Sequence, residues 1–587
     1  MSIQVKVTTS VRFNLVLAIC LLSNGDLFAF SDEPEDEGSL KSHVRLIIDK
    51  LISVEKNKLT KLELIRERLG ETAQNFDLDH KGWASSGRRI HEDPIGAFVT
   101  VRRLRSLFNE IEELLNNIDG DQEHEKLQDR FERLATKYNV PTEKDLHEHG
   151  ETLLRLRAFY NLNIDDLASG SLHDGHSRLG LERGYRMDSE DCFEVGQIAY
   201  YKGQYRESIV WLQKSLQIIE EENEGLLNGT MERNDFERYS LARSVAARTL
   251  DYLAHAAYKV NQTRYAAQLT KQWLRLDPES ERAKYNLEYY EEFQANGHEI
   301  GSQIGDDGAQ TSNEFLETFT HPAEQEHGLD YKFDINDYSI VEDKTLRNLC
   351  RDDTFSTEDK RCIVDSALVH SYPELRVEIL HTDPYIVRIY DIVTEKEAGH
   401  LIKSAMPKLH RSTVQTEAGL VTSDFRIAQT AWLSRHSDPT VEQIERRVSG
   451  LLNLNMNGSE HLQVVNYKIG GFYGPHLDAA RKSGHNLADD SLPISNLARN
   501  DRLATVLIYL NDVEAGGSTV FPRLNLKVRP VARSAVVWYN ILKNGLGDAR
   551  TLHTGCPVLL GTKWVATIWP REAANSFLRP CGLGAGE

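Results

Sequence analysis

The chain has 587 residues and a formal net charge of −20, because 89 Asp and Glu outnumber 69 Lys and Arg. This acidic balance argues against a nucleic-acid-binding protein, whose contact surface should be basic. Hydrophobic residues make up 40% and charged residues 27%. That composition excludes global disorder, and the length predicts roughly two to five domains.

The first part of the chain, residues 1–29, has the features of a secretory signal peptide. Lys6 and Arg12 form a short positive region, and Phe13 to Leu22 is mostly apolar. We expect cleavage between Gly25 and Ala29, with an N-terminal core helix as the alternative. No later run reaches about 18 apolar residues, so we expect no membrane span.

The cysteine content fits an oxidising compartment. Cys20 is lost with the signal peptide, and the five cysteines that remain allow two disulfides and a free Cys192. These residues alone leave the pairing open. The chain does not end on a KDEL-type signal, so we expect it either to be secreted or to be held in the endoplasmic reticulum by another component.

Residues 30–165 are predicted to form a helical N-terminal domain. Its longest apolar run keeps a strict 4,3 spacing: Ala97, Val101, Leu104, Phe108, Ile111, Leu115 and Ile118. This spacing is typical of a coiled-coil seam, which would make the region a self-association domain. A helix packed on a globular core would show the same pattern.

Residues 166–296 are predicted to contain two tetratricopeptide-like repeats. Small residues stand where helices would cross, large ones fill the gaps, and Pro278 ends the second repeat. Tyrosines are concentrated here: Tyr200, Tyr201, Tyr205, Tyr239, Tyr252, Tyr258 and Tyr265. Most would pack in the core, but a groove lined with tyrosine would also suit a polyproline II peptide.

Residues 297–340 are predicted to be a linker, and residues 341–587 a domain of short strands. The linker begins with a polar stretch that has no apolar period. The strands beyond it are rich in β-branched and aromatic residues, as in a sandwich or jelly roll. We expect strands at Tyr385–Tyr390, Gln463–Tyr467, Leu503–Tyr509, Ala535–Tyr539 and Trp564–Trp569, and helices at Thr394–Lys408 and Val441–Leu452.

The strongest chemical signal is His476-Leu-Asp478, which follows a strand-like segment and a Gly-Gly turn. In an extended chain residues i and i+2 point to the same side, so both side chains can reach one metal ion. The H-x-D pattern is weak alone, because it also occurs at His91, His381 and His436. Here, however, His553 follows after further strands.

Two histidines and one carboxylate form the facial triad of non-haem Fe(II) oxygenases, which leaves three positions open for a 2-oxo acid and O2. A zinc hydrolase could use the same three ligands, but it would need a nearby Glu as general base. It would also have no use for Lys563, ten residues after His553. A buried lysine is unfavourable unless it meets an anion, such as a carboxylate of 2-oxoglutarate.

Three segments carry motifs of high specificity: Asn466-Tyr-Lys-Ile-Gly-Gly-Phe-Tyr-Gly-Pro-His-Leu-Asp478, Val513-Glu-Ala-Gly-Gly-Ser-Thr-Val-Phe-Pro522, and Thr551-Leu-His-Thr-Gly-Cys-Pro-Val-Leu559 with Gly561-Thr-Lys-Trp564. They resemble the catalytic domain of collagen prolyl 4-hydroxylase α subunits. The helical region resembles that family's dimerisation domain, and Glu190–Gly196 and Leu250–Leu253 resemble its peptide-substrate-binding domain.

The resemblance implies a fold and a set of roles. The fold is an all-α N-terminal half followed by a double-stranded β-helix (jelly-roll) dioxygenase domain. The iron ligands would be His476, Asp478 and His553, and Lys563 would bind the C5 carboxylate of 2-oxoglutarate. Other residues would line the cofactor pocket: Tyr467, Tyr473, Thr505 and Trp569.

The resemblance also bears on the cysteines and on the repeats. It implies the disulfides Cys350–Cys362 and Cys556–Cys581. In the repeats Tyr205 and Tyr252 would contact proline-rich peptides, and His255 stands where the family has a tyrosine.

The implied activity is hydroxylation of proline at C4 in collagen-like X-Pro-Gly chains, coupled to decarboxylation of 2-oxoglutarate to succinate with Fe(II), O2 and L-ascorbate. The implied assembly is an α2β2 tetramer with protein disulfide isomerase in the endoplasmic reticulum, which would explain the missing retention signal. Two alternatives are a prolyl hydroxylase for other secreted proteins and a catalytically silent scaffold that binds proline-rich peptides.

Overall fold

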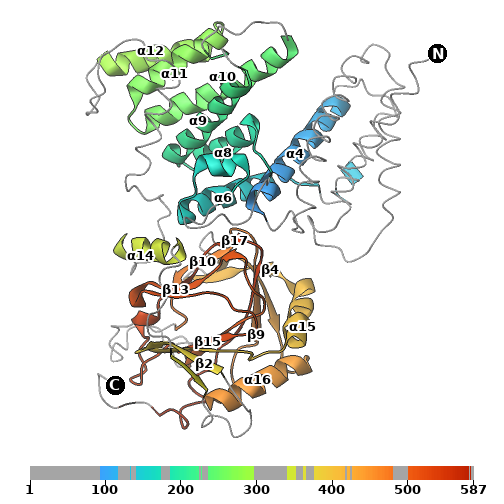
Figure 1. The fold of residues 1–587 in the computed structure, drawn as a ribbon, viewed down its shortest axis with the longest axis vertical. Helices are drawn as coiled ribbons and strands as arrows, with labels where there is room; N and C mark the ends of the chain where they lie inside the picture. Colours follow the sequence, from blue (N-terminus) through green and yellow to red (C-terminus); the bar gives the residue numbers. More distant parts are fainter. Residues whose placement is uncertain are drawn as a thin grey trace, which may run out of the picture. The chain divides into compact units, whose positions relative to one another are not determined.

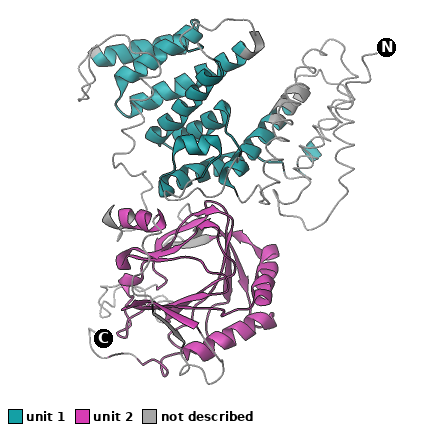
Figure 2. Cartoon of the chain, viewed as in Figure 1, with its two compact units in different colours: residues 1–330 teal, residues 331–587 magenta. Residues whose placement is uncertain are grey.

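The structure is a computed structural model of the chain. It describes residues 93–116, 140–172, 185–223, 236–295, 340–351, 361–364, 376–416, 419–422, 426–479 and 500–580, and the isolated positions 132, 133, 136, 226, 227 and 582. The predicted signal peptide and most of the predicted linker lie outside these residues. The chain divides into two compact units, residues 1–330 and 331–587 (Figure 2). No helix in the described part of the chain is both long enough and apolar enough to cross a membrane.

The described part of the first unit is helical (Figure 1). Its helices are α4 (Pro94–Asn116), α6 (Glu143–Tyr160), α7 (Ile164–Ser169), α8 (Ser189–Tyr201), α9 (Tyr205–Glu222), α10 (Phe236–Lys259), α11 (Thr263–Leu276) and α12 (Glu281–Ala295). Local sequence sets several helix starts. Thr142 and Asp188 each form a capping box with an aspartate three residues later, which satisfies free backbone N–H groups.

The predicted repeats are confirmed as two helix pairs, α8–α9 and α10–α11, followed by α12. Gly196 lets α9 approach α8 closely, because a Cβ at this position would lie 2.8 Å from two side-chain carbons of Leu212. Gly203, in the turn between the two helices, has a φ of +73°, which favours glycine. Small residues therefore stand at the crossing and at the turn, as the repeat pattern predicts.

Helix α4 packs inside the first unit along its N-terminal half. Ala97, Val101 and Leu104, from the predicted seam, are buried there, and α4 contacts α6. Arg102 pairs with Asp191 at the start of α8. The N-terminal half of the 4,3 run therefore packs on the core of its own unit, which was the alternative to a coiled-coil seam. The side chains of Ile111, Leu115 and Ile118 lie outside the described ones, so a self-association seam there stays a prediction.

The described part of the second unit is mostly β. Its strands are β1 (Arg361–Val364), β2 (Arg376–Thr382), β3 (Tyr385–Ile389), β4 (His410–Arg411), β5 (Thr413–Thr416), β6 (Gly419–Thr422), β7 (Arg426–Ile427), β8 (Gln429–Leu433), β9 (Leu462–Tyr467), β10 (Phe472–His476), β11 (Ala504–Tyr509), β12 (Ala515–Gly516), β13 (Thr519–Phe521), β14 (Leu526–Val528), β15 (Ala535–Tyr539), β16 (His553–Gly555), β17 (Val558–Leu560) and β18 (Lys563–Ile568). Its helices are α14 (Ile340–Arg351), α15 (Glu395–Ala405) and α16 (Pro439–Leu452).

Two antiparallel sheets form the jelly roll that the strand pattern predicts. The large sheet has the order β1-β2-β3-β15-β11-β18-β9-β8-β4, and the small sheet has the order β14-β13-β16-β10-β7. Apolar side chains from both sheets, including Trp538 of the large sheet and Phe521 of the small one, form one core. A second core packs α15 and α16 against the large sheet, on the outside of the barrel (Figure 1).

The predicted elements of this unit are confirmed to within one or two residues at most ends. The five predicted strands correspond to β3, β9, β11, β15 and β18. The helix predicted from Thr394 begins after that residue, which caps α15, and the last residues of its predicted range form a short 3-10 turn.

The disulfide pairing differs from the one implied by the resemblance. Cys350 is bonded to Cys556, so neither the Cys350–Cys362 nor the Cys556–Cys581 disulfide forms, and Cys192 is buried and free. The reason is the packing of α14, which contacts β13 and β14 of the small sheet. Cys350 ends up beside β14, where its carbonyl accepts a hydrogen bond from Lys527, and near the end of β16, where Cys556 lies. The side chain of Cys362 and residue Cys581 are not among those described.

Candidate active site

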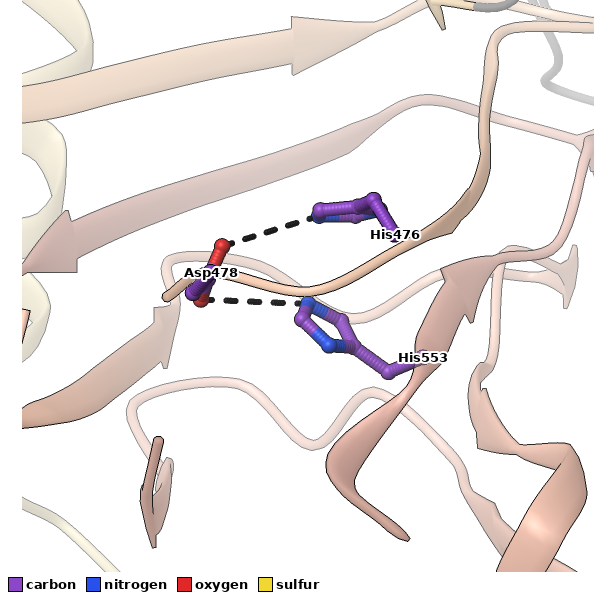
Figure 3. Close-up of side chains that lie close together, drawn as sticks. All are labelled: His476, Asp478 and His553. Atoms are coloured by element: carbon purple, nitrogen blue, oxygen red, sulfur yellow. Dashed lines mark ion pairs between the residues drawn. The ribbon is translucent and has the colours of Figure 1, made fainter. Parts of the chain in front are cut away.

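His476, Asp478 and His553 converge at one point of the barrel although they come from different strands (Figure 3). His476 ends β10, Asp478 follows two residues later, and His553 begins β16. His476 and His553 are direct partners across the two antiparallel strands. One ligand atom from each of the three residues lies within 4.8 Å of the others. Strand pairing thus brings the distant His553 to the His476-x-Asp478 motif.

Both imidazoles are oriented by backbone carbonyls. Nδ1 of His476 lies 2.8 Å from the carbonyl oxygen of Gly474, and Nδ1 of His553 lies 3.0 Å from that of Thr551. A carbonyl can only accept, so each Nδ1 carries the hydrogen. The lone pair of each Nε2 then faces Asp478, with Nε2–carboxylate distances of 3.7 Å and 3.9 Å. Fixing the tautomer through the second nitrogen is typical of metal-binding histidines.

The Asp478 carboxylate is held by two donors on one oxygen. Thr505 donates to Oδ2 across 2.6 Å, and the indole N–H of Trp569 donates to the same atom across 3.1 Å. Asn540 donates in turn to the Thr505 hydroxyl at 2.9 Å. Thr505 and Trp569 therefore contact a predicted metal ligand directly, and Oδ1 receives neither of these hydrogen bonds.

The electrostatics of the site favour the forms that bind a metal. Burial and the neighbouring His553 lower the pKa of His476 to about 3, so its ring is neutral near pH 7. Burial by itself would raise the pKa of Asp478, but both histidines, Arg502 and the Thr505 hydrogen bond hold it well below its usual range. Neutral imidazoles and an ionised carboxylate are the forms that coordinate divalent ions.

Aromatic rings surround the two histidines. The ring of Tyr473 stacks on His476 with centroids 3.6 Å apart, and Trp538 and Phe521 lie 4.9 Å and 5.6 Å from the His553 ring. Trp538 and Phe521 are almost fully buried. These rings restrict the histidine orientations and exclude water from the back of the site.

Lys563 is buried beside the triad without an anion. It begins β18, is 3% exposed, and has Tyr467 as its direct neighbour on β9. Its Nζ lies 5.3 Å and 5.6 Å from the ring centroids of Tyr467 and Tyr509. Burial lowers its pKa to about 7. Among the described residues none forms an ion pair with this ammonium group, which makes it a binding point for an anion.

The Lys563 ammonium group lies on the same side of β16 as the His553 side chain. Gly555 lies two residues after His553 on β16, so its missing side chain would point to the same side as that histidine. A Cβ at Gly555 would lie 3.9 Å from Nζ of Lys563. A ligand that spans from the triad to the lysine would therefore lie along this face of β16.

The sequence analysis missed two arginines at the site. The guanidinium of Arg426, in β7, lies 4.6 Å from the Tyr473 ring centroid and donates to the side-chain oxygen of Gln463 on β9 at 3.1 Å. That of Arg502 lies 3.7 Å from a ring centroid of Trp569 and 3.9 Å from Oδ1 of Asp478. An arginine at the start of an apolar strand segment is a weak signal in a sequence, and no spacing rule connects either one to the triad.

The donor set fits Fe(II), and the other H-x-D motifs do not form a comparable cluster. Two imidazole nitrogens and a carboxylate oxygen with room for further ligands match non-haem iron. His381 instead has its Nδ1 2.9 Å from the carbonyl of Pro384. Within the described ranges, the triad is the one group of three or more His, Cys, Asp and Glu side chains close enough to hold a metal ion. His91 lies outside those ranges.

The predicted peptide-contacting tyrosines are brought together in the first unit. Tyr200 contacts both Tyr205 and Tyr252, with ring centroids 5.6 Å and 5.0 Å apart. Tyr201 donates to or accepts from the Tyr252 hydroxyl at 2.7 Å and is 65% exposed. Tyr265, in contrast, is buried against Gln213 and belongs to the core.

Three family models match the chain. Residues 42–174 match the prolyl 4-hydroxylase alpha-subunit N-terminal region, residues 189–296 match the prolyl 4-hydroxylase peptide-substrate-binding domain, and residues 462–571 match the 2OG-Fe(II) oxygenase superfamily. The last match contains all three residues of the triad and Lys563.

Curated relatives are similar over most of the chain. Prolyl 4-hydroxylase subunit alpha-2 of Caenorhabditis elegans is 31% identical over 97% of this chain and 96% of its own length. Prolyl 4-hydroxylase subunit alpha-1 of Homo sapiens is 30% identical over 91% of each chain. A solved structure, viral collagen prolyl hydroxylase from Paramecium Bursaria Chlorella virus-1 in its 2OG complex, is 25% identical over 32% of this chain and 95% of the viral chain, with a TM-score of 0.25.

Proposed function

Because the chain belongs to the family of prolyl 4-hydroxylase α subunits, we propose that it hydroxylates proline at C4 in collagen-like X-Pro-Gly polypeptides. The reaction would consume 2-oxoglutarate and O2 and release succinate and CO2. One observation adds to the family assignment: a triad of two histidines and a carboxylate lies on the same side of β16 as a buried lysine that forms no ion pair with a described residue.

Different residues of the site would bind the metal ion, bind the co-substrate and orient the carboxylate ligand. His476, Asp478 and His553 would hold Fe(II), which when bound supplies the oxidising chemistry. Lys563 would bind the C5 carboxylate of 2-oxoglutarate, because its ammonium group needs an anion in this buried position. Thr505 and Trp569 fix the Asp478 carboxylate through Oδ2, and preorganised groups of this kind need no rearrangement during the reaction.

The aromatic surroundings keep the chemistry away from bulk water. Tyr473 covers one face of the His476 ring, and Tyr467 lies between Lys563 and Arg426. In the first unit, Tyr205 and Tyr252 would bind the proline-rich chain, which matches the peptide-substrate-binding family model there.

The cellular setting is part of the proposal. A signal peptide over residues 1–29 and a disulfide in the catalytic unit favour the endoplasmic reticulum lumen. There we propose an α2β2 tetramer with protein disulfide isomerase as the β subunit. Residues 30–165 would provide α–α contacts, and L-ascorbate would reduce iron after turnovers uncoupled from peptide.

The decisive test is succinate formation from 2-oxoglutarate with Fe(II) and ascorbate. The chain would be co-expressed with protein disulfide isomerase and assayed with and without a (Pro-Pro-Gly) repeat peptide. We expect peptide-dependent turnover and a mass gain of one oxygen per modified proline. His553→Ala should abolish turnover because it removes a ligand, whereas His381→Ala, which changes the same residue type in another H-x-D motif, should retain it. An assembly that binds iron and peptide but makes no succinate would disprove the enzymatic proposal.

A further inference from the structure

Six rings form a continuous aromatic row on the first unit. The row crosses α8, α10 and α12 and consists of Tyr200, Tyr201, Tyr252, His255, Tyr258 and Tyr289. Neighbouring ring centroids along it lie 5.0–6.1 Å apart. Two pairs are joined through hydroxyl groups: Tyr201 to Tyr252 at 2.7 Å and Tyr258 to Tyr289 at 2.9 Å. His255 is the one imidazole in this row and lies near its middle.

The spacing of the row along α10 matches a polyproline II helix. Tyr252, His255 and Tyr258 are three residues apart, so they follow one face of α10. Six residues of α-helix rise about 9 Å. One turn of polyproline II takes three residues and also rises about 9 Å. Tyr252 and Tyr258 can thus contact equivalent positions of a triplet-repeat peptide, one turn apart, with His255 between them.

Hydrogen bonding fixes the His255 ring. Its Nδ1 lies 2.5 Å from the Tyr200 hydroxyl. Partial burial and the positive charges of Lys259 and Arg282 lower the pKa of His255, so the ring is neutral near pH 7. The other ionisable groups around it are the Tyr200, Tyr252, Tyr258 and Tyr290 phenols and Asp251, which pairs with Arg282. The phenol O–H of Tyr200 is the stronger donor of this pair, so Nδ1 accepts and the neutral ring carries its hydrogen on Nε2.

We propose that His255 is a specificity-determining residue of the peptide site, where it donates from Nε2 to one backbone carbonyl of a polyproline II peptide held by Tyr252 and Tyr258. This inference rests on the proposed peptide-binding function of the row. Carbonyls of a polyproline II chain have no internal partner, so they are available as acceptors. A phenyl ring at this position would offer the same stacking surface but no donor.

The hydrogen bond would set the register of the peptide. Stacking on the tyrosine rings tolerates sliding, because every proline offers a similar apolar face. A donor at one fixed position between two rings favours the registers that bring a carbonyl to it. Repeats whose period equals one polyproline II turn satisfy His255, Tyr252 and Tyr258 together, so the site would prefer regular triplet repeats to irregular proline-rich chains.

The test compares variants of the full chain for binding of a short, dye-labelled (Pro-Pro-Gly) repeat peptide by fluorescence polarisation. His255→Phe keeps an aromatic ring but removes both nitrogens, and we expect about fivefold weaker binding, as for loss of one hydrogen bond. His255→Gln places an amide donor near the position of Nε2, so it should restore most of the affinity. Circular dichroism would check that each variant keeps its helix content.

Changes in the peptide backbone can identify the carbonyl group that accepts from His255. Replacing one carbonyl at a time by a thioamide, a weaker acceptor, should weaken wild-type binding at one position of a triplet and leave His255→Phe unaffected there. Equal affinities of the wild type and His255→Phe would overturn the inference. Tyr252→Ala distinguishes failure of the His255 role from failure of the proposed peptide site. If Tyr252→Ala also binds the peptide normally, the row is not the peptide site and the proposed function of this domain is wrong. If Tyr252→Ala alone loses binding, the role of His255 is wrong and the peptide site stands.

Discussion

Thr505 donates a 2.6 Å hydrogen bond to Oδ2 of Asp478, although the two residues are 27 positions apart in the sequence. Both side chains are buried, and the Thr505 hydroxyl also accepts from Asn540. The carboxylate is thereby fixed before any ligand arrives. Groups that orient metal ligands in this way contribute substantially to metal affinity.

Thr505→Val is expected to weaken Fe(II) binding by about 10- to 100-fold, because it removes the hydroxyl at nearly constant volume. Metal affinity would be measured by anaerobic titration. Thr554→Val is the matched control, since Thr554 is also a buried threonine but its hydroxyl makes no hydrogen bond to a described residue. Equal loss in both variants would mean that the effect comes from strand packing, not from the Asp478 contact.

Binding of 2-oxoglutarate should weaken as the pH rises above about 7. Burial disfavours the charge of Lys563 and lowers its pKa to about 7. A bound carboxylate needs the protonated form and raises this pKa. Below pH 7 the lysine is mostly charged already, so affinity should be flat there. Above it, affinity should fall by up to about tenfold per pH unit, measured by anaerobic calorimetry with Fe(II).

Lys563→Met provides the control for this pH dependence. This variant should bind 2-oxoglutarate weakly at every pH, and its affinity should not fall as the pH rises above 7. The lysine pKa is lower in the fold than its ordinary 10.5, so the folded state loses stability as the pH falls from about 10 to about 7. The methionine variant should therefore unfold at a higher temperature than the wild type at pH 7 in the absence of ligand. A wild-type affinity without pH dependence would show that Lys563 does not bind the carboxylate.

Arg426→Met should raise the KM for 2-oxoglutarate more than it lowers kcat. The guanidinium lies 4.6 Å from the Tyr473 ring centroid and donates to Gln463 of β9, the strand on which Tyr467 is the cross-strand neighbour of Lys563. Methionine keeps the apolar stem but removes both interactions, so the walls of the pocket loosen. Arg446→Met, on the exposed face of α16, is the control. A change in kcat alone would place Arg426 outside co-substrate binding.

Gly196→Ala should destabilise the helical unit by about 1–3 kcal/mol, because the new methyl group overlaps Leu212. Gly399→Ala is the contrast: no atom lies within 4 Å of its Cβ position in α15, so the better helix propensity of alanine should be neutral or stabilising. Differential scanning calorimetry would measure both. Destabilisation of similar size in the two variants would contradict the close packing of α8 on α9.

Local signals predicted much of this architecture. Short runs rich in β-branched and aromatic residues predicted β9, β11 and β18, and the helix predicted from Thr394 corresponds to α15. The His476-x-Asp478 motif works the same way, since strand geometry alone places both side chains on one face. His553 was a candidate only because it follows after further strands and matches a ligand in the resemblance, since pairing between β10 and β16 is a long-range property that no local pattern expresses.

Long-range packing decided what the sequence could not predict. The contacts of Arg426 and Arg502 join strands far apart in the chain, so neither residue stands out by its spacing. The docking of α14 on the small sheet gave Cys350 a partner 206 residues away. The 4,3 spacing around Val101 is common to coiled coils and to helices buried in a domain, and burial favoured the second for the N-terminal half of α4.

The opposition of His476 and His553 across β10 and β16 has a consequence for how the chain can change. Two of the three metal-binding candidates are set by strand register, not by the number of residues between them. Segments between these strands can gain or lose residues without moving the histidines apart, provided that both strands keep their pairing. A slip of one residue in β16 would instead turn His553 to the opposite face of its sheet. Length variation should therefore be tolerated in the loops beyond Asp478, whereas an insertion or deletion within β10 or β16 should abolish metal binding.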